Sequence, residues 1–279
     1  MLPELMIENE AFIRLVCFIS IFAVMAFWEF AKPCRTLTLN KPRRWLNNIG
    51  LAFINSMLLR LVFPTAALGI ALFAETNNLG LLHQFNLPSW ITLPLSIIIM
   101  DCIIYQQHVL FHRYPLLWRV HQVHHTDIDY DVTTGVRFHP LEILLSMLVK
   151  GVTILMLGPP LLAVLIFEIL LNGTALFNHS NIALPKMIDT LLRKIVVTPD
   201  MHRVHHSVDA TEMNRNFGFN FSFWDRLFGT YLDQPKISQA TMPVGLADHR
   251  DSKIVNRLNG LLRMPLISTQ TRNKTQNGK

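Results

Sequence analysis

Twelve histidines stand in this chain of 279 residues, and eight of them fall into three closely spaced groups. His108 and His112 lie four residues apart, a spacing that puts both side chains on one face of a helix. The other two groups share the pattern HxxHH and comprise His121, His124, His125, His202, His205 and His206. Neutral imidazole is a common ligand of transition metals. Because surface runs of histidine do not explain the repeated spacing, the three groups predict a metal centre.

The number of imidazoles suggests two metal ions. Eight exceed the four ligands of a tetrahedral zinc ion, and imidazole suits iron, zinc, copper and nickel alike. His139 and His179 stand singly at the two ends of an apolar stretch, where each is either a ligand or a polar anchor. His83 belongs to a loop expected on the other side of the membrane. His249 lies in a charged run and is expected to be solvated.

The composition excludes several classes of protein. Hydrophobic residues make up 51% of the chain and charged residues only 16%, with a mean hydropathy of +0.31, whereas soluble domains carry about 25% charged residues. These values argue against a soluble enzyme, a disordered chain and a nucleic-acid-binding domain. The net charge of +6 fits basic loops facing a membrane surface. Cys17, Cys34 and Cys102 have no paired spacing, which argues against a disulfide framework or a thiolate metal site.

Four apolar regions are long enough to cross a membrane, which takes about 20 helical residues. They are residues 12–30, 49–73, 90–111 and 141–177. The last is long enough for two passes and is divided by Gly158-Pro159-Pro160, so it predicts a helical hairpin that either spans or re-enters the membrane. The expected fold class is therefore all-α: a multi-span membrane protein with a cytoplasmic, histidine-rich helical cap.

The distribution of basic residues predicts the orientation. The loop between the first two spans is basic and holds Lys32, Arg35, Lys41, Arg43 and Arg44, whereas residues 75–89 contain no Lys or Arg. The positive-inside rule then places the N-terminus outside, and the first loop, residues 112–140 and the tail in the cytoplasm. Nearly all the histidines fall on that side. Within the apolar stretches, Lys150 and Glu168 either pair across the hairpin or reach the interface, and Arg60 is a third such charge.

The chain divides into three parts on this reading. Residues 1–95 form the N-terminal spans and loops, residues 96–235 a catalytic domain, and residues 236–279 a cytoplasmic tail. The polar, unpatterned end from residue 268 to 279 is expected to be disordered.

The order HxxxH, HxxHH, HxxHH in a multi-span membrane protein resembles the fatty acid hydroxylase/sterol desaturase superfamily. The flanking residues agree: DxxxYxxHxxxH from Asp101, RVHQVHH from Arg119 and TPDMHRVHHS from Thr198 resemble its histidine boxes. Phe138-His139-Pro140 and Asn178-His179-Ser180 resemble its single intervening histidines. NFG at 216–218 and WDRLFGT at 224–230 resemble the stretch after its last box. The similarity covers roughly residues 96–235.

This resemblance implies a non-haem di-iron centre, in which zinc is a possible substitute, and a lipid substrate that is hydroxylated or desaturated with dioxygen. It also makes His139 and His179 ligands, so that the ligand set is His108, His112, His121, His124, His125, His139, His179, His202, His205 and His206. Electrons are expected from a nicotinamide cofactor through a small cytochrome or ferredoxin with its reductase, because the chain has neither CxxCH nor GxGxxG. Arg203 and Arg215 either dock such a carrier or face lipid headgroups.

Four further residues are candidates for the catalytic site. Asp101, Asp200 and Asp225 are expected to accept N–H hydrogen bonds from ligand histidines and so fix their tautomers; Asp225 alternatively pairs with Arg226. Tyr105 either lines the oxygen side of the pocket or only packs.

Three functions compete at this stage. A lipid oxygenase or desaturase is the preferred interpretation, and a zinc-containing membrane hydrolase or a structural metal-binding protein is the alternative. A metal transporter is disfavoured because its ligands are expected near the bilayer midplane. The partners expected are the lipid substrate, membrane lipids and dioxygen, without nucleic acid. A bacterial inner membrane is favoured over the endoplasmic reticulum.

Overall fold

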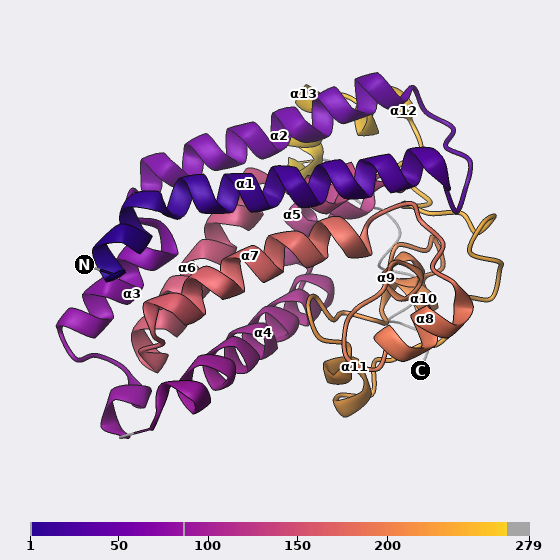
Figure 1. Cartoon of the computed structure of the whole chain (residues 1–279). Helices are drawn as coiled ribbons and strands as arrows, with labels where there is room; N and C mark the ends of the chain where they lie inside the picture. The colour runs from indigo at the N-terminus through magenta and orange to yellow at the C-terminus, as the bar shows by residue number, and fades with distance from the viewer. Residues whose placement is uncertain (1, 86, 267–279) are drawn as a thin grey trace.

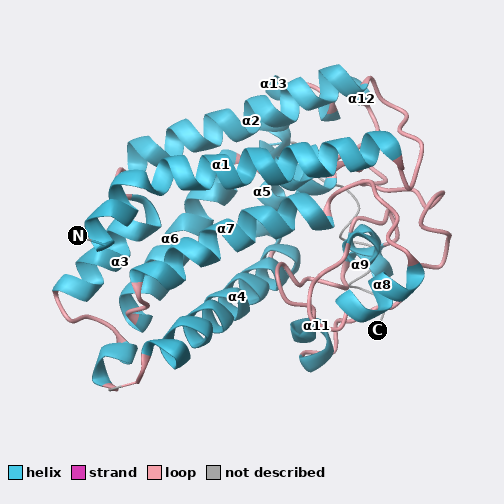
Figure 2. Cartoon of the chain, in the orientation of Figure 1, coloured by secondary structure: helices cyan, strands magenta, loops and turns pink. Residues whose placement is uncertain are grey.

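The computed structural model describes residues 2–85 and 87–266, and within these ranges the ordered elements are helices, without a strand (Figure 2). The longer helices are α1 (Leu2–Ala31), α2 (Lys41–Val62), α3 (Ala66–Thr76), α4 (Ser89–Arg113), α5 (Pro115–His125), α6 (Pro140–Leu157) and α7 (Leu161–Asn178). The shorter ones are η1 (Leu81–Gln84), η2 (Val132–Val136), α8 (Lys186–Leu192), α9 (Pro199–His205), α10 (Ala210–Met213), α11 (Phe223–Leu227), α12 (Ser252–Val255), α13 (Leu258–Arg263) and η3 (Met264–Leu266). The expected disorder of residues 268–279 lies outside the described residues.

Five segments of the described chain are long and apolar enough to span a membrane, which confirms a multi-pass membrane protein. They are Glu8–Ala31, Lys41–Gln84, Ser89–Arg113, Pro140–Leu157 and Leu161–Asn178. The last two form the predicted hairpin. Each helix has 18 residues and so extends about 27 Å, close to the hydrocarbon thickness of about 30 Å. The turn between them begins at Gly158, whose φ of 65° suits glycine.

The second predicted span is not one helix. The chain leaves helical geometry at Phe63, with φ −127° and ψ 72°, and α3 begins only at Ala66. Pro64 explains the break, because proline lacks a donor N–H and pushes the residue before it out of the helical region. The segment therefore contains two helices joined by a short turn.

The helices pack side by side into a bundle whose two ends differ (Figure 1). One end carries α5 and α8 to α11, together with the loop between α1 and α2. The other end carries the start of α1, the connection between α3 and α4, and the α6–α7 turn. There Gly80, with φ 107°, lies so close to Gly158 that a Cβ would approach its backbone nitrogen to 2.2 Å. His83 also contacts this turn, and so it lies far from the other histidine groups.

Charged residues inside the apolar stretches pair with one another. Lys150 Nζ lies 2.5 Å from Glu168 Oε1, which confirms the predicted pairing across the hairpin. Arg14 of α1 adds a second cation, with Nη2 2.8 Å from Glu168 Oε2. The carboxylate is thus held between three helices, as expected for a charge removed from water. Arg60 is exposed on α2.

Candidate metal centre

Nine of the ten predicted ligand histidines meet in two buried groups. The five-histidine group comprises His108, His112, His121, His125 and His205, and the four-histidine group comprises His124, His179, His202 and His206. Within each group, one ligand nitrogen per residue lies within 4.8 Å of all the others. The groups adjoin, because the rings of His125 and His206 stack with their centroids 4.5 Å apart.

The helical period decides which histidines of one HxxHH pattern share a face. In α5, His121 and His125 are four residues apart and share a face, whereas His124 points toward the other group. The second HxxHH pattern does the reverse. His202 and His206 enter the four-histidine group, and His205 enters the five-histidine group. Each HxxHH pattern therefore supplies both groups.

Residues at the N-termini of α5 and α9, the short helices that carry these ligands, favour the start of a helix there. Pro115 and Pro199 occupy the first positions of α5 and α9, where the fixed φ of proline suits a helix and its missing N–H costs nothing. The side chain of Thr198 caps α9 by accepting a hydrogen bond from the backbone N–H of Met201. His179 is the C-cap residue of α7.

Backbone carbonyls fix the tautomer of three histidines. The Nδ1–H of His108 donates to the carbonyl of Phe217 at 2.8 Å, and that of His205 to the carbonyl of Arg215 at 2.8 Å. In the four-histidine group, the Nδ1–H of His179 donates to the carbonyl of Ala175 at 2.7 Å. Because a carbonyl only accepts, the proton of each neutral ring lies on Nδ1 and the lone pair on Nε2.

These lone pairs face each other without a proton between them. Nε2 of His108 lies 3.0 Å from Nε2 of His205. Burial lowers the pKa of His179 and of His205 to about 3, and it lowers the pKa of His124, His202 and His206 well below the ordinary value. Neutral imidazoles with converging lone pairs repel one another unless a cation lies among them. The donor set therefore fits transition-metal ions.

A second observation supports this fit in the four-histidine group. Nε2 of His179 lies 3.0 Å from Nε2 of His124 and 3.1 Å from Nε2 of His202. His206 is 1% exposed, and neither of its ring nitrogens has a hydrogen-bond partner among the described residues. Buried polar atoms without partners are costly. A metal ion bound at this position would engage one of these two nitrogens, and the other would carry the proton of the neutral ring.

Glu142 is a functional residue that the sequence interpretation missed. Its Oε1 lies 2.6 Å from Nδ1 of His121, and both side chains are buried. Because the carboxylate accepts the Nδ1–H, the Nε2 lone pair of His121 is directed toward the five-histidine group. Glu142 lies in the first turn of α6, where acidic residues are common for reasons of helix polarity alone. The sequence position of Glu142 therefore does not indicate a contact with a ligand histidine.

Two of the three predicted aspartates, Asp101 and Asp225, accept hydrogen bonds from loop residues and not from histidines. Asp101 accepts the indole N–H of Trp224 at 2.9 Å and two backbone N–H groups, from Asn220 and Phe221. Asp225 accepts N–H from Phe217 and Gly218 and the hydroxyl of Thr230. Its burial raises its pKa to about 6 despite these bonds. Both aspartates order the loop whose carbonyl, at Phe217, orients His108.

Asp200 and Tyr105 also lie away from the imidazole nitrogens. Asp200 Oδ1 accepts a hydrogen bond from Arg203 at 2.7 Å. The Tyr105 hydroxyl lies 2.7 Å from Oγ1 of Thr230, and its ring stacks on Phe228. Tyr105 therefore packs, which was one of its two predicted roles.

His139 is the predicted ligand that the structure does not bring into either group. Its Nδ1 accepts the backbone N–H of Leu141, and its Nε2–H donates to the carbonyl of Leu262 at 3.2 Å. Both ring nitrogens are thus engaged, and neither lone pair is left for a metal ion. His139 caps the start of α6, which is the anchoring role that the sequence left open.

Two expectations about surface residues differ from the structure. Arg203 is fully buried. It donates hydrogen bonds to the carbonyls of Ser180 and Ile182, and these bonds connect α9 to the segment after α7. Arg203 is therefore not available to dock a carrier, whereas Arg215 is exposed. His249, expected in solvent, is 8% exposed.

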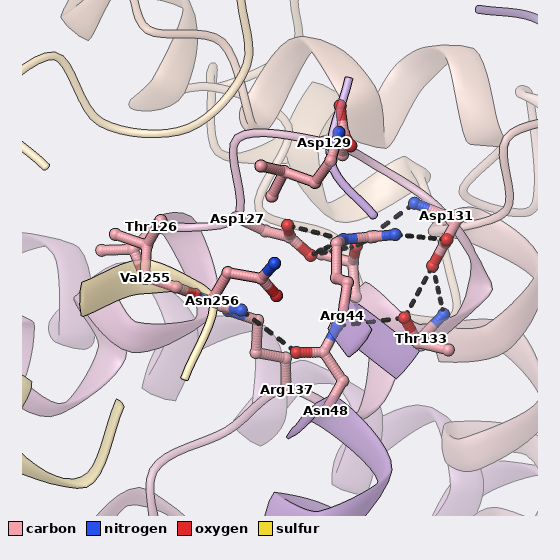
Figure 3. Close-up of polar contacts among 12 residues, drawn as sticks. Arg44, Asn48, Thr126, Asp127, Asp129, Asp131, Thr133, Arg137, Val255 and Asn256 are labelled. Carbon is pink, nitrogen blue, oxygen red and sulfur yellow. Dashed lines mark hydrogen bonds and ion pairs between the residues drawn. The ribbon is translucent and has the colours of Figure 1, made fainter. Parts of the chain in front are cut away.

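A buried polar network supports the segment that follows α5 (Figure 3). Arg44 of α2 lies between Asp127 and Asp131, with its Nε 2.8 Å from Asp127 Oδ1. Arg137 donates to the carbonyl of Val123 in the last turn of α5, at 2.9 Å, and to Oγ1 of Thr126. Both guanidinium groups are fully buried. They position the turn of α5 that carries His124 and His125.

Comparison with known proteins agrees with this geometry. A family model described as fatty acid hydroxylase matches residues 93–230. Ornithine lipid hydroxylase OlsE of Rhizobium tropici is 31% identical over 150 residues, which is 54% of this chain and 44% of that protein. Human alkylglycerol monooxygenase is 30% identical over 155 residues, or 53% of this chain and 32% of that protein.

A plant relative shows the same region of similarity. Methylsterol monooxygenase 2-2 of Arabidopsis thaliana is 27% identical over 165 residues, covering 58% of this chain and 61% of that protein. No solved structure matches. This chain spans less than half of the length of the bacterial and human relatives named above.

The matched segment includes most of α4, both HxxHH patterns, His179, and the loop ordered by Asp101 and Asp225. The family match and the convergence of nine histidines identify the same part of the molecule. Over residues 93–230, this chain is similar to the fatty acid hydroxylase family.

Proposed function

We propose that this protein is a membrane-bound di-iron oxygenase that hydroxylates a lipid. The observation that carries the proposal is the pair of adjoining buried imidazole groups, in which carbonyls and one carboxylate direct Nε2 lone pairs inward. Five and four ligands accommodate two ions. Iron bound there would supply the activation of dioxygen that attack on an unactivated C–H bond requires.

The chain's own residues bind the ions, orient the imidazoles and exclude water. Every histidine of the two groups is at most 3% exposed, so solvent has little access to the reacting atoms. The described residues include no cytochrome-type or dinucleotide motif. We therefore propose that electrons arrive from a small cytochrome or ferredoxin with its reductase.

The names of the relatives guide the substrate class. One is an ornithine lipid hydroxylase, one an alkylglycerol monooxygenase and one a methylsterol monooxygenase. These names agree on the insertion of oxygen and differ in the lipid. We propose hydroxylation in preference to desaturation, on a lipid that reaches the histidine end of the bundle from the membrane.

The proposed cytoplasmic side is the histidine end of the bundle. Its support is the basic loop between α1 and α2, which lies at that end, and the absence of Lys and Arg from residues 77–85 and 87–88 at the other. A reporter inserted near Arg35 should read cytoplasmic, and one near Asn78 should read external. Reporters that read from the same side would contradict this orientation.

The test of the function combines metal analysis with oxygen uptake. Protein purified after growth in iron-rich medium should hold two iron ions per chain and consume dioxygen only with both lipid and reductant. Lipids of expressing cells should show a product one oxygen heavier. Zinc as the sole metal, with neither oxygen uptake nor a new lipid, would instead support a hydrolase or a structural role.

A further inference from the structure

A small hollow lies where the start of α2 meets α12. It has a volume of about 190 Å³ and is lined by Leu39, Asn40, Arg43, Ser252, Lys253, Asn256 and Arg257. The two lining segments are about 200 residues apart in the sequence and belong to the bundle end that carries the histidines. The hollow is separate from both histidine groups, because none of its lining residues belongs to either.

The lining of this hollow holds three cations and no carboxylate. Arg43, Lys253 and Arg257 are exposed, and none of them forms an ion pair with a carboxylate of the described residues. Asp251, which caps α12 by accepting the backbone N–H of Lys253, lies next to the lining in sequence and offsets one of the three charges. Three like charges around one hollow repel one another. An anion bound among them would relieve that repulsion.

The two sides of the hollow are fixed relative to each other. Asn47 of α2 accepts the backbone N–H of Leu258 at 2.8 Å and donates to the carbonyl of Asn256. Below these bonds, Leu51 of α2 packs in one buried cluster with Val255 and Leu261. The three cations are therefore held on a packed base.

Two side chains in the lining can donate hydrogen bonds to an anion. Ser252 carries a hydroxyl group and Asn40 an amide, and both line the hollow together with the three cations. Donors and cations together suit a phosphate group.

The position of the hollow relative to the membrane indicates the source of the phosphate. Leu46 and Phe53 lie on α2 three and ten residues after Arg43, and they are 74% and 66% exposed. In a membrane-spanning helix such apolar side chains face lipid, so the hollow opens at the level where the apolar surface ends. Lipid headgroups occupy that level.

We propose that this hollow binds the phosphate group of an anionic phospholipid at the histidine end of the bundle. Arg43, Lys253 and Arg257 supply the charge, and the side chains of Ser252 and Asn40 supply hydrogen-bond donors. Inorganic phosphate presents the same chemistry and is the second source to be distinguished. The proposal does not depend on the oxygenase reaction.

The test measures lipid retention by the full chain. Wild-type protein in detergent is mixed with phosphatidylglycerol, phosphatidylcholine or inorganic phosphate, and bound molecules are counted by native mass spectrometry. Phosphatidylglycerol should be retained in preference to phosphatidylcholine. Each basic side chain near an anionic lipid contributes about fivefold to affinity, so Arg43→Gln/Arg257→Gln should weaken retention by about 25-fold. Arg43→Lys/Arg257→Lys should restore most of it.

The matched control is Lys186→Gln/Lys194→Gln, which removes two exposed cations outside the hollow at the same end of the bundle. This variant should bind like wild type. Retention of inorganic phosphate but not lipid, lost in the Arg43/Arg257 variant, would keep the phosphate site and assign the free ion as its ligand. Equal retention in the wild type and that variant, or an equal loss in the control, would overturn the proposal. Circular dichroism and size-exclusion profiles verify that the variants are folded.

Discussion

Both histidine groups draw ligands from α5 and α9, whereas α4 contributes only to the five-histidine group and the end of α7 only to the four-histidine group, and the two groups are supported differently. In the five-histidine group, three of the rings donate Nδ1–H to fixed acceptors, namely the Phe217 carbonyl, the Arg215 carbonyl and the Glu142 carboxylate. In the four-histidine group only His179 does so. Nδ1 of His124, His202 and His206 has no hydrogen-bond partner among the described residues.

This difference indicates in which group the imidazole rings are oriented before a metal ion binds. Hydrogen bonds to Nδ1 fix the ring orientation and tautomer of a ligand histidine, and a carboxylate acceptor raises its basicity. The five-histidine group therefore presents more of its lone pairs in advance. We expect it to bind the first ion more tightly, and the four-histidine group to be ordered partly by the ion that it binds.

The largest expected effect comes from removing one ligand of each group. His121→Ala should deplete the five-histidine group and His202→Ala the four-histidine group, so each variant should lose one metal ion preferentially and all turnover. Metal per chain and lipid product measure this. His83→Ala, at the other end of the bundle, should match the wild type. Full activity in either ligand variant would contradict the two-ion site.

Arg44→Gln should weaken both groups together. It leaves Asp127 and Asp131 buried without their cation, which costs about 3–5 kcal/mol of folding stability. Because these aspartates lie in the segment after His125, both groups should lose metal affinity. Thermal unfolding in detergent and metal titration are the measurements. Lys194→Gln, which removes an exposed cation outside both this network and the hollow, is the control and should unfold like the wild type. Equal stabilities would show that the network does not support the metal centre.

Glu142→Gln should lower the metal affinity of the five-histidine group and leave that of the four-histidine group unchanged. Glutamine can still accept the Nδ1–H of His121 through its carbonyl oxygen, but it lacks the negative charge. Loss of such a partner typically lowers metal affinity about 10–100-fold, and here only the five-histidine group should be affected. A metal titration should therefore show one weakened site and one unchanged site. Glu212→Gln removes another buried carboxylate, which accepts the backbone N–H of Lys236 instead of a ligand Nδ1–H, and should change neither. Equal weakening of both sites would contradict the assignment of Glu142.

Acid should destabilise the metal-free protein through both groups alike. Histidine ordinarily titrates near 6.5, whereas burial lowers the pKa of His179 and His205 to about 3 in the folded state. As the pH falls, the unfolded chain binds protons first, so stability is lost from about 6.5 downward until the folded rings also protonate. Between pH 6.5 and 5 each ring contributes a loss of up to about 2 kcal/mol. Unfolding of the chelator-treated protein at several pH values measures this, and an unchanged stability from pH 7 to 5 would contradict it.

The smallest effect is expected at His139. Its two ring nitrogens bind the backbone at Leu141 and Leu262, so His139→Gln should retain both metal ions and most turnover. His179→Gln, at the other end of the α6–α7 hairpin, should lose metal from the four-histidine group. Metal content of the two folded variants is the direct comparison. Loss of metal in His139→Gln would return this residue to the ligand set.

The sequence by itself determined the fold class and the place of the chemistry. Apolar stretches of spanning length predict membrane helices because the bilayer leaves few other ways to satisfy the backbone. Repeated HxxHH spacing predicts a metal centre because one helical turn brings positions three and four apart together. Lys150 and Glu168 form the pair that was one of two possibilities left open by the sequence, because charges in an apolar hairpin need either a partner or the interface. All of these signals are local.

Only the tertiary structure decided how the histidines divide and what supports them. His124 and His205 each leave their own helical pair to join the other group, which depends on how α5 and α9 face each other. Glu142 reaches His121 from another helix, and the carbonyls of Phe217 and Arg215 have no sequence signal at all. Any residue can supply a carbonyl, and a carboxylate becomes a partner only when packing excludes water and fixes its distance. That dependence on packing is also why Asp101 and Asp225 order a loop, although their residue type suited a ligand's partner equally well.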